Sequence, residues 1–139
     1  MQLEVVTPRG TVVSAEVSEV TAPGLLGEFG ALPGHTPFIT ALRPGVLSWK
    51  TNDAKGKASL LAIGAGYAEV SGNDRIVVIT RATVRPDEIN AADLKQKLED
   101  NERMARDWVD GHKPTRDELA SDAAWLTAQL DLAAIAAKP

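Results

Sequence analysis

The chain has 139 residues, 44% of them apolar and 24% charged, which allows one ordinary domain or a small domain with an appendage. It contains no cysteine, which excludes a disulfide framework, a thiol nucleophile and a thiolate zinc site, and it has no apolar run of transmembrane length, so we expect no direct membrane insertion. The net charge of −4 comes from residues 88–139, where eleven acids face seven bases, and since no Lys/Arg cluster is present, we expect no nucleic-acid partner.

Residues 1–20 alternate between apolar and charged side chains, without the apolar core of a secretory signal or the Arg/Ser bias of a transit peptide, so we expect no targeting peptide. Short β-branched runs then recur as far as Val84 and predict strands at residues 3–6, 11–13, 17–20, 46–49, 60–63, 67–70 and 76–79. Turn residues at 7–10, 52–56 and 71–74 separate several of them. Many short strands without an intervening helix predict an antiparallel β-sandwich or flattened barrel over residues 1–86.

Residues 27–45 contain four glycines, three prolines and His35. Glycine allows positive φ and proline fixes φ near −65°, so we expect a rigid, sharply cornered loop that runs into a short apolar strand. A loop constrained in this way is typical of a surface that contacts a partner.

After Pro86 the hydrophobic period changes from two residues to about 3.6. Asn90 is placed to cap a helix over residues 91–110, with Leu94, Leu98, Ala105 and Trp108 on one face. Residues 111–114, Gly-His-Lys-Pro, end this helix.

A second helix is predicted over residues 116–137. Thr115 and Glu118 fit a capping box, and the apolar seam consists of Leu119, Ala123, Leu126, Leu130, Ala133 and Ala137. The short connection makes the two helices antiparallel neighbours, so residues 87–139 are expected to form a helical hairpin. Because two helices bury little core, the hairpin must dock on the sheet domain, on a partner, or alternate between them.

His35 is the candidate for catalysis, but its local partners are only Thr36 and Glu28, and no G-x-S-x-G elbow is present. A histidine that organises its loop or contacts a partner fits better, and we expect no catalytic residue. With His112 in the turn between the helices, the two histidines form no recognisable metal site.

Cofactor motifs are incomplete. Gly64-Ala65-Gly66 lacks the third glycine of a dinucleotide fingerprint and precedes a strand, so we expect no cofactor. Trp125 lies about 100° around its helix from Leu126, so it either packs against the sheet domain or makes a regulatory contact.

The order G-E-x-G-x-x-P-G-H-x-P in residues 27–37, supported by residues 42–47 and 64–70, resembles the signature of the epsilon subunit of F-type ATP synthases, the counterpart of the mitochondrial delta subunit. The resemblance covers essentially the whole chain. It implies a non-catalytic rotor subunit that joins the foot of the gamma subunit to the c ring. Glu28 corresponds to an acid that faces the polar loops of the c ring and His35 to a histidine on the gamma-facing side, so Glu28, Phe29, Leu32 and His35 are the expected contacts.

The same resemblance implies a peripheral position on the cytoplasmic face of a bacterial plasma membrane. In some members the hairpin rises along gamma and blocks ATP hydrolysis, so the beta and alpha subunits are further candidate partners. A generic sandwich-plus-hairpin adaptor and a small hydrolase that uses His35 are the alternatives. Co-purification with a gamma-like partner, or an activity lost on replacing His35, would separate them.

The hairpin departs from the family pattern where ATP is bound. The I/L-D-x-x-R-A motif of ATP-binding members corresponds here to residues 89–94, Ile-Asn-Ala-Ala-Asp-Leu. Asn90 therefore replaces the acid of the motif, and Asp93 replaces its arginine. Further family arginines correspond to Asp100, Trp125 and Gln129. Since an acid repels a triphosphate, we expect weak or no ATP binding.

The charges of the second helix also disfavour electrostatic inhibition. In resembling inhibitory members, basic residues of this helix approach an acidic segment of the beta subunit. Here the helix carries Asp117, Glu118, Asp122 and Asp131, the last where a relative has arginine, against Arg116 and Lys138. Like charges repel, so we expect any braking of hydrolysis to be steric, with Trp125 and Asp131 as candidate regulatory contacts.

Overall fold

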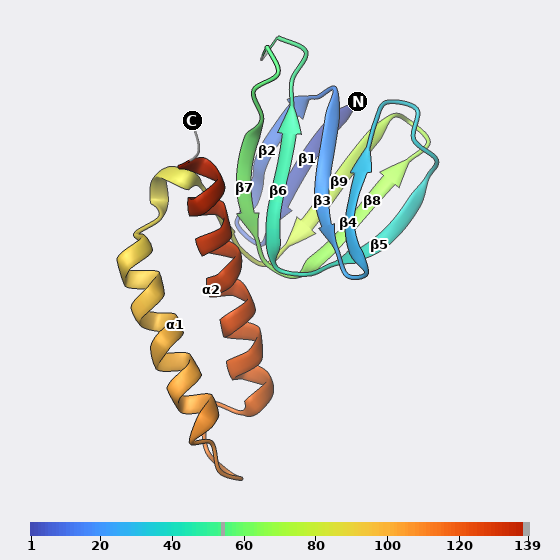
Figure 1. Ribbon diagram of the computed structural model, residues 1–139. Coiled ribbons are helices and arrows are strands. Elements are labelled where there is room, and N and C mark those ends of the chain that lie inside the picture. The colour runs from blue at the N-terminus through green and yellow to red at the C-terminus, as the bar shows by residue number, and fades with distance from the viewer. Residues whose placement is uncertain (54, 138–139) are drawn as a thin grey trace.

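The computed structural model describes residues 1–53 and 55–137 and contains a curled sheet followed by two helices (Figure 1). The strands are β1 (Gln2–Thr7), β2 (Gly10–Glu16), β3 (Glu19–Gly24), β4 (Gly27–Ala31), β5 (Phe38–Leu42), β6 (Gly45–Lys50), β7 (Ser59–Ile63), β8 (Gly66–Ser71), β9 (Arg75–Thr80) and β10 (Thr83–Val84). A 3₁₀ turn, η1 (Pro86–Glu88), leads to α1 (Ala91–Arg106) and α2 (Arg116–Ala136). The expected β-sandwich followed by a helical hairpin is confirmed.

The strands pair in the order β10-β7-β6-β3-β5-β8-β9-β1-β2, with β4 paired to β3. The pairs are antiparallel except β1 with β9, which run parallel with Leu3 opposite Ile76. The prediction of a purely antiparallel sheet is therefore wrong for the β1–β9 pair. Parallel neighbours need a long crossover rather than a turn, and here most of the sheet domain provides it.

Alternating side chains form the core between the walls of the curled sheet. Leu3 and Val5 of β1, Leu47 of β6, and Ile76 and Val78 of β9 are fully buried at alternate positions. The period of two read from the sequence therefore follows the inward face of these strands.

One strand lies where only a loop was expected. Residues 27–45 contain β4 as well as the anticipated apolar strand, β5. Glycine and glutamate disfavour strands, but pairing with β3 from Val20 to Gly24 overrides that preference. The strand expected at 17–20 begins at Glu19 instead, and the expected turn at 52–56 includes Ala54, which lies outside the described residues.

The first helix is shorter than expected. Asn90 caps it as predicted, its side chain accepting a hydrogen bond from the Asp93 amide at 3.1 Å. It ends at Arg106 rather than at residue 110. Beyond the helix, Trp108 donates from Nε1 to the Pro114 carbonyl at 3.1 Å, so Trp108 belongs to the turn. Ala105, which was also expected on the apolar face of the helix, is exposed.

The second helix has two buried faces instead of one seam. The predicted capping box is present, with the Glu118 amide donating to Thr115 Oγ1 at 3.2 Å. Leu119 is buried toward α1 and Leu126 and Leu130 are half-buried, but Ala128 and Leu132 are also buried. They lie in the half of α2 next to the sheet, where α2 contacts β6 and β7 (Figure 1). The predicted seam therefore describes one of two buried faces, because α2 lies between α1 and the sheet and packs against both.

Candidate partner-contact surface

The β3–β4 hairpin ends in two exposed leucines. Leu25 and Leu26 form its two-residue tip and keep 61% and 102% of their surface exposed. Glu28 follows on β4, opposite Pro23, and is also exposed. Two large apolar side chains and a carboxylate at one tip are typical of a contact surface.

Backbone contacts brace this tip against the strands beside it. The Leu25 amide donates to the Ala41 carbonyl at 2.9 Å, and the Arg43 amide donates to the Pro23 carbonyl at 3.0 Å. Arg43 also donates from Nε to the Gly24 carbonyl at 3.3 Å. Three hydrogen bonds therefore tie the tip to β5 and to the β5–β6 connection.

Close packing under the tip requires a glycine. A Cβ added at Gly45 would lie 2.6 Å from Pro23 Cβ, closer than real carbon atoms approach. Gly45 thus lets the chain after Pro44 pass directly beneath β3. The x-P-G element of the sequence signature has this packing role.

Leu32 and His35 lie beyond the other end of β4. Leu32 is 57% exposed, and the His35 amide donates to its carbonyl at 3.0 Å, closing a turn. The Gly34 amide donates to Asp74 Oδ1 at 2.9 Å, which fastens the turn to the β8–β9 connection. His35 Nδ1 lies 2.7 Å from the Thr36 carbonyl, so the ring organises its own loop.

An aromatic cluster joins the two ends of β4. The Phe38 ring lies 5.1 Å from the Phe29 ring, edge to face, and 5.1 Å from the His35 ring. Phe29 is half-buried against the core. Of the four predicted contacts, Glu28 and Leu32 are well exposed, and they are four residues apart along a strand, about 13 Å. They therefore form two surfaces, not one.

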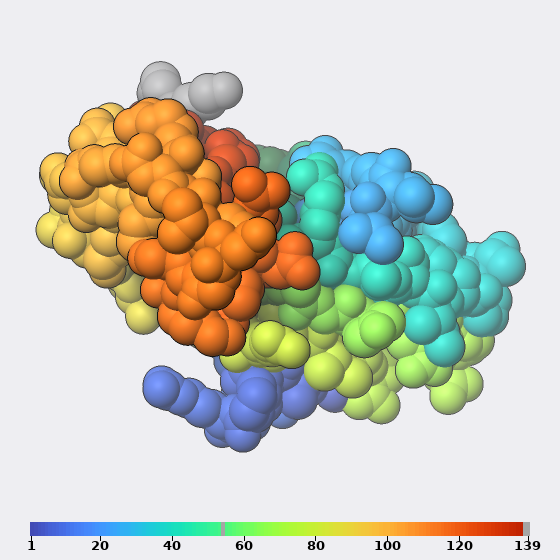
Figure 2. All heavy atoms as spheres, turned by 90° about the horizontal axis from the view of Figure 1, so that it is seen from below, coloured from blue at the N-terminus to red at the C-terminus, as the bar shows by residue number. Residues whose placement is uncertain are grey.

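An apolar outer face of the sheet was missed in the sequence. Ile39, Tyr67 and Ile79 keep 70%, 62% and 55% of their surface exposed, and Tyr67 is paired directly with Ile79 across β8 and β9. A hollow of about 760 Å³ adjoins this face and is bordered by Ser121 of α2, beside the lobe that the hairpin forms (Figure 2). The signal was present as bulky apolar residues at outward positions of alternating strands.

The two candidate regulatory residues differ in setting. Trp125 is half-buried and borders a hollow of about 290 Å³ together with Lys97, Asn101 and Met104, so it lies beside α1. Asp131 is exposed. Trp125 therefore combines partial packing with an accessible edge, whereas Asp131 faces solvent.

The residues at the ATP-motif positions have structural partners. Asn90 caps α1, Asp93 pairs with Lys97 at 3.1 Å, and Asp100 accepts from Arg103 at 3.1 Å. These interactions stabilise a helix start and a helix surface. Across residues 1–53 and 55–137, no group of three or more His, Cys, Asp or Glu residues is placed to hold a metal ion.

Comparison with known proteins decides the family. The family model described as "ATP synthase, Delta/Epsilon chain, beta-sandwich domain" matches residues 1–86. The chain belongs to the ATP synthase delta/epsilon family. The expected resemblance to epsilon subunits is thus confirmed.

Bacterial epsilon chains are similar over much of their length. The ATP synthase epsilon chain of Geotalea daltonii is 45% identical over 98 residues, which cover 70% of this chain and 68% of that one. The epsilon chain of Desulfosudis oleivorans is 49% identical over 90 residues, covering 65% of each.

Solved structures show the same fold. A chain in the Euglena gracilis mitochondrial ATP synthase structure "OSCP/F1/c-ring in rotational state 1" matches with a TM-score of 0.81 at 22% identity, covering 95% of this chain and 79% of that chain. None of the helices in the described part of this delta/epsilon-family chain has both the length and the apolar character needed to cross a membrane.

Proposed function

We propose that this chain is a non-catalytic rotor subunit in the central stalk of an F-type ATP synthase, linking the gamma subunit to the c ring. The observation that carries the proposal is the braced β3–β4 tip with Leu25, Leu26 and Glu28 exposed. A coupling that transmits torque needs a stiff contact, and the backbone hydrogen bonds to Ala41 and Pro23 provide stiffness.

The two ends of β4 suit two partners. We assign the tip with Glu28 to the polar loops of the c ring. The opposite end, with Leu32, His35 and the neighbouring Ile39, is assigned to gamma, because Leu32 and Ile39 give this end an exposed apolar surface of its own, separate from the tip that carries Glu28. With these two partners, we expect the subunit to lie peripherally on the cytoplasmic face of a bacterial plasma membrane.

The hairpin is assigned a weak regulatory role. Its exposed acids would repel an acidic segment of the beta subunit, so we expect any contact with beta or alpha to be steric. With the ATP-motif positions engaged in capping and surface pairs, calorimetry on the isolated chain should detect no micromolar ATP binding. A micromolar affinity would contradict this assignment.

Cross-linking in the assembled enzyme tests the rotor assignment. The chain has no cysteine, so Glu28→Cys introduces a single thiol at the tip. We expect a disulfide with a cysteine placed in the polar loop of the c subunit, and none from the control Glu99→Cys on the exposed surface of α1. Assembly without gamma, or equal cross-linking from both positions, would favour the adaptor alternative.

A further inference from the structure

The far half of the helical hairpin, from Asn101 to Leu119, contains little apolar packing. In the first half of α1, Leu94 is buried and Leu98 half-buried toward α2. In the second half, Met104 is 40% exposed and Ala105 is exposed. The buried residue in the second half of α1 is polar: Asn101, which is 6% exposed, and it lies against Leu119 of α2, which is 2% exposed.

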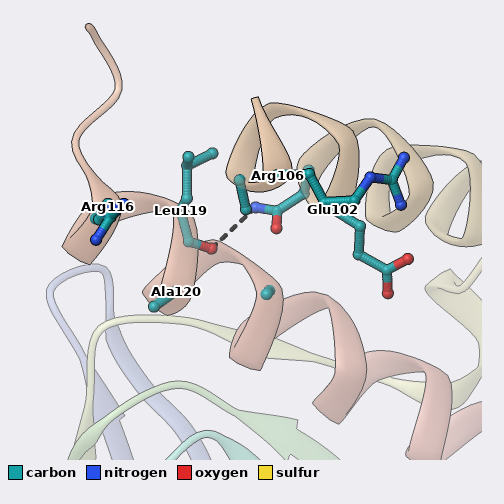
Figure 3. A pocket seen from close by; sticks show the side chains of 8 residues that line it. Glu102, Arg106, Arg116, Leu119 and Ala120 are labelled. Atoms are coloured by element: carbon teal, nitrogen blue, oxygen red, sulfur yellow. Dashed lines mark hydrogen bonds between the residues drawn. The ribbon is translucent and has the colours of Figure 1, made fainter. Parts of the chain in front are cut away.

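Asn101 crosses from one helix to the other. Its Nδ2 donates to the Leu119 carbonyl at 2.9 Å, a contact between residues 18 apart in the chain (Figure 3). Among the described residues, it is the one side-chain hydrogen bond that joins α1 to α2. Trp108, which lies beyond the end of α1, donates to the Pro114 carbonyl and stacks under Arg116 at the start of α2, so these contacts hold the turn closed.

Hollows flank this bond on both sides. One of about 570 Å³ and one of about 290 Å³ are both lined by Asn101 and Leu119. Apolar side chains around such hollows can slide or repack at low cost, so packing alone defines the axial position of the helices poorly here. A directional hydrogen bond such as that from Asn101 to Leu119 defines the axial position of the helices better than this packing does.

We propose that Asn101 fixes the register of α1 against α2. A buried amide costs free energy unless it is hydrogen-bonded. Shifting one helix along the other by part of a turn would move Asn101 away from the Leu119 carbonyl while keeping the amide between the helices. A register in which no acceptor faces the amide is therefore penalised, as with a single polar residue in the core of a coiled coil. This role does not depend on the proposed function.

Distance measurements between spin labels test the proposal. Because the chain lacks cysteine, Glu102→Cys and Ala120→Cys place one label on each helix, beside the larger hollow. The parent should give one narrow distance distribution. N101L, which keeps bulk but removes the bond, should remain helical and give a broadened or two-peaked distribution. The control Gln96→Leu removes an exposed hydrogen bond within α1 and should leave the distribution narrow.

N101A provides a second variant with no added bulk. It should broaden the distribution and make amides in the first turns of α2 exchange roughly tenfold faster, the effect of losing one hydrogen bond. A narrow, parent-like distribution in either folded variant would overturn the proposal. Loss of the helical signal in both variants would also overturn it, because Asn101 would then hold the hairpin together rather than select its register.

Discussion

Replacing Leu132 with alanine should detach the hairpin from the sheet while leaving the sheet folded. Leu132 has no exposed surface and lies one turn from Ala128 in the half of α2 that packs next to β6 and β7. These are the two fully buried side chains of that half. Docking therefore depends on very few apolar contacts.

The magnitude follows from the burial of the side chain. A buried Leu→Ala change costs about 2–5 kcal/mol, from lost transfer free energy and from the cavity left behind. Because the interface is narrow and can partly collapse, we expect the substitution to weaken docking by about 3 kcal/mol. This corresponds to roughly a hundredfold change in the docking equilibrium constant. The core of the sheet is formed by other residues and should not change.

Amide hydrogen exchange measures this directly. Peptides from α2 should exchange roughly a hundredfold faster in Leu132→Ala, while peptides from β8 and β9 keep their protection. Ile135→Ala is the matched control, because Ile135 lies on the same helix but is 42% exposed, and its effect should stay below about tenfold. Equal effects of the two changes, or loss of protection in β8 and β9, would refute the docking argument.

Three further predictions concern the sheet domain and the hairpin. Gly45→Ala should lower the free energy of unfolding in urea by about 1–3 kcal/mol, because the added Cβ would overlap Pro23. Gly30→Ala is the control and should have the smaller effect, because its added Cβ would meet nothing closer than 3.9 Å. The Glu16 carboxylate, 2.7 Å from the Met1 ammonium, raises the pKa of that ammonium above its usual value of 8.0, so its contribution to stability is complete below pH 8 and is lost as the pH rises through the raised pKa. In urea unfolding, Glu16→Gln should lose less stability between neutral and alkaline pH than the parent chain does. A pH profile of stability identical to that of the parent would contradict the stabilising role of the Met1–Glu16 pair. Deleting residues 88–139 should leave ATP hydrolysis by the assembled enzyme nearly unchanged, and a several-fold rise would show that the hairpin is a strong brake.

Local signals in the sequence predicted much of the fold. Alternation located β8 and β9 because one face of each strand is buried and the other faces solvent. Asn90 and the Thr115 capping box marked the starts of both helices, since a cap acts within three residues. Such features depend on neighbours in the chain and can be read without the fold.

Non-local features could not be read in the same way. The parallel β1–β9 pair and the strand β4 exist because distant segments meet, and no local propensity encodes that meeting. Leu132 lies outside the predicted seam of α2, and it is buried in the half of the helix that contacts the sheet.

The candidate contact surface shows the same limit. The signature drew attention to residues 27–45, but it could not show that the Phe29 ring packs against Phe38. The exposed Leu25 and Leu26 at the tip carried no motif and were missed.

The parallel seam between β1 and β9 also constrains how the protein is made. On the ribosome, the first strand must wait for a neighbour that ends at Thr80, so the sheet cannot close until nearly the whole domain has emerged. Pairing across such a separation is slow compared with helix formation. Until then β1, whose Leu3 and Val5 belong to the core, has an unpaired edge, and nascent chains are expected to be most vulnerable to aggregation and proteolysis in that interval.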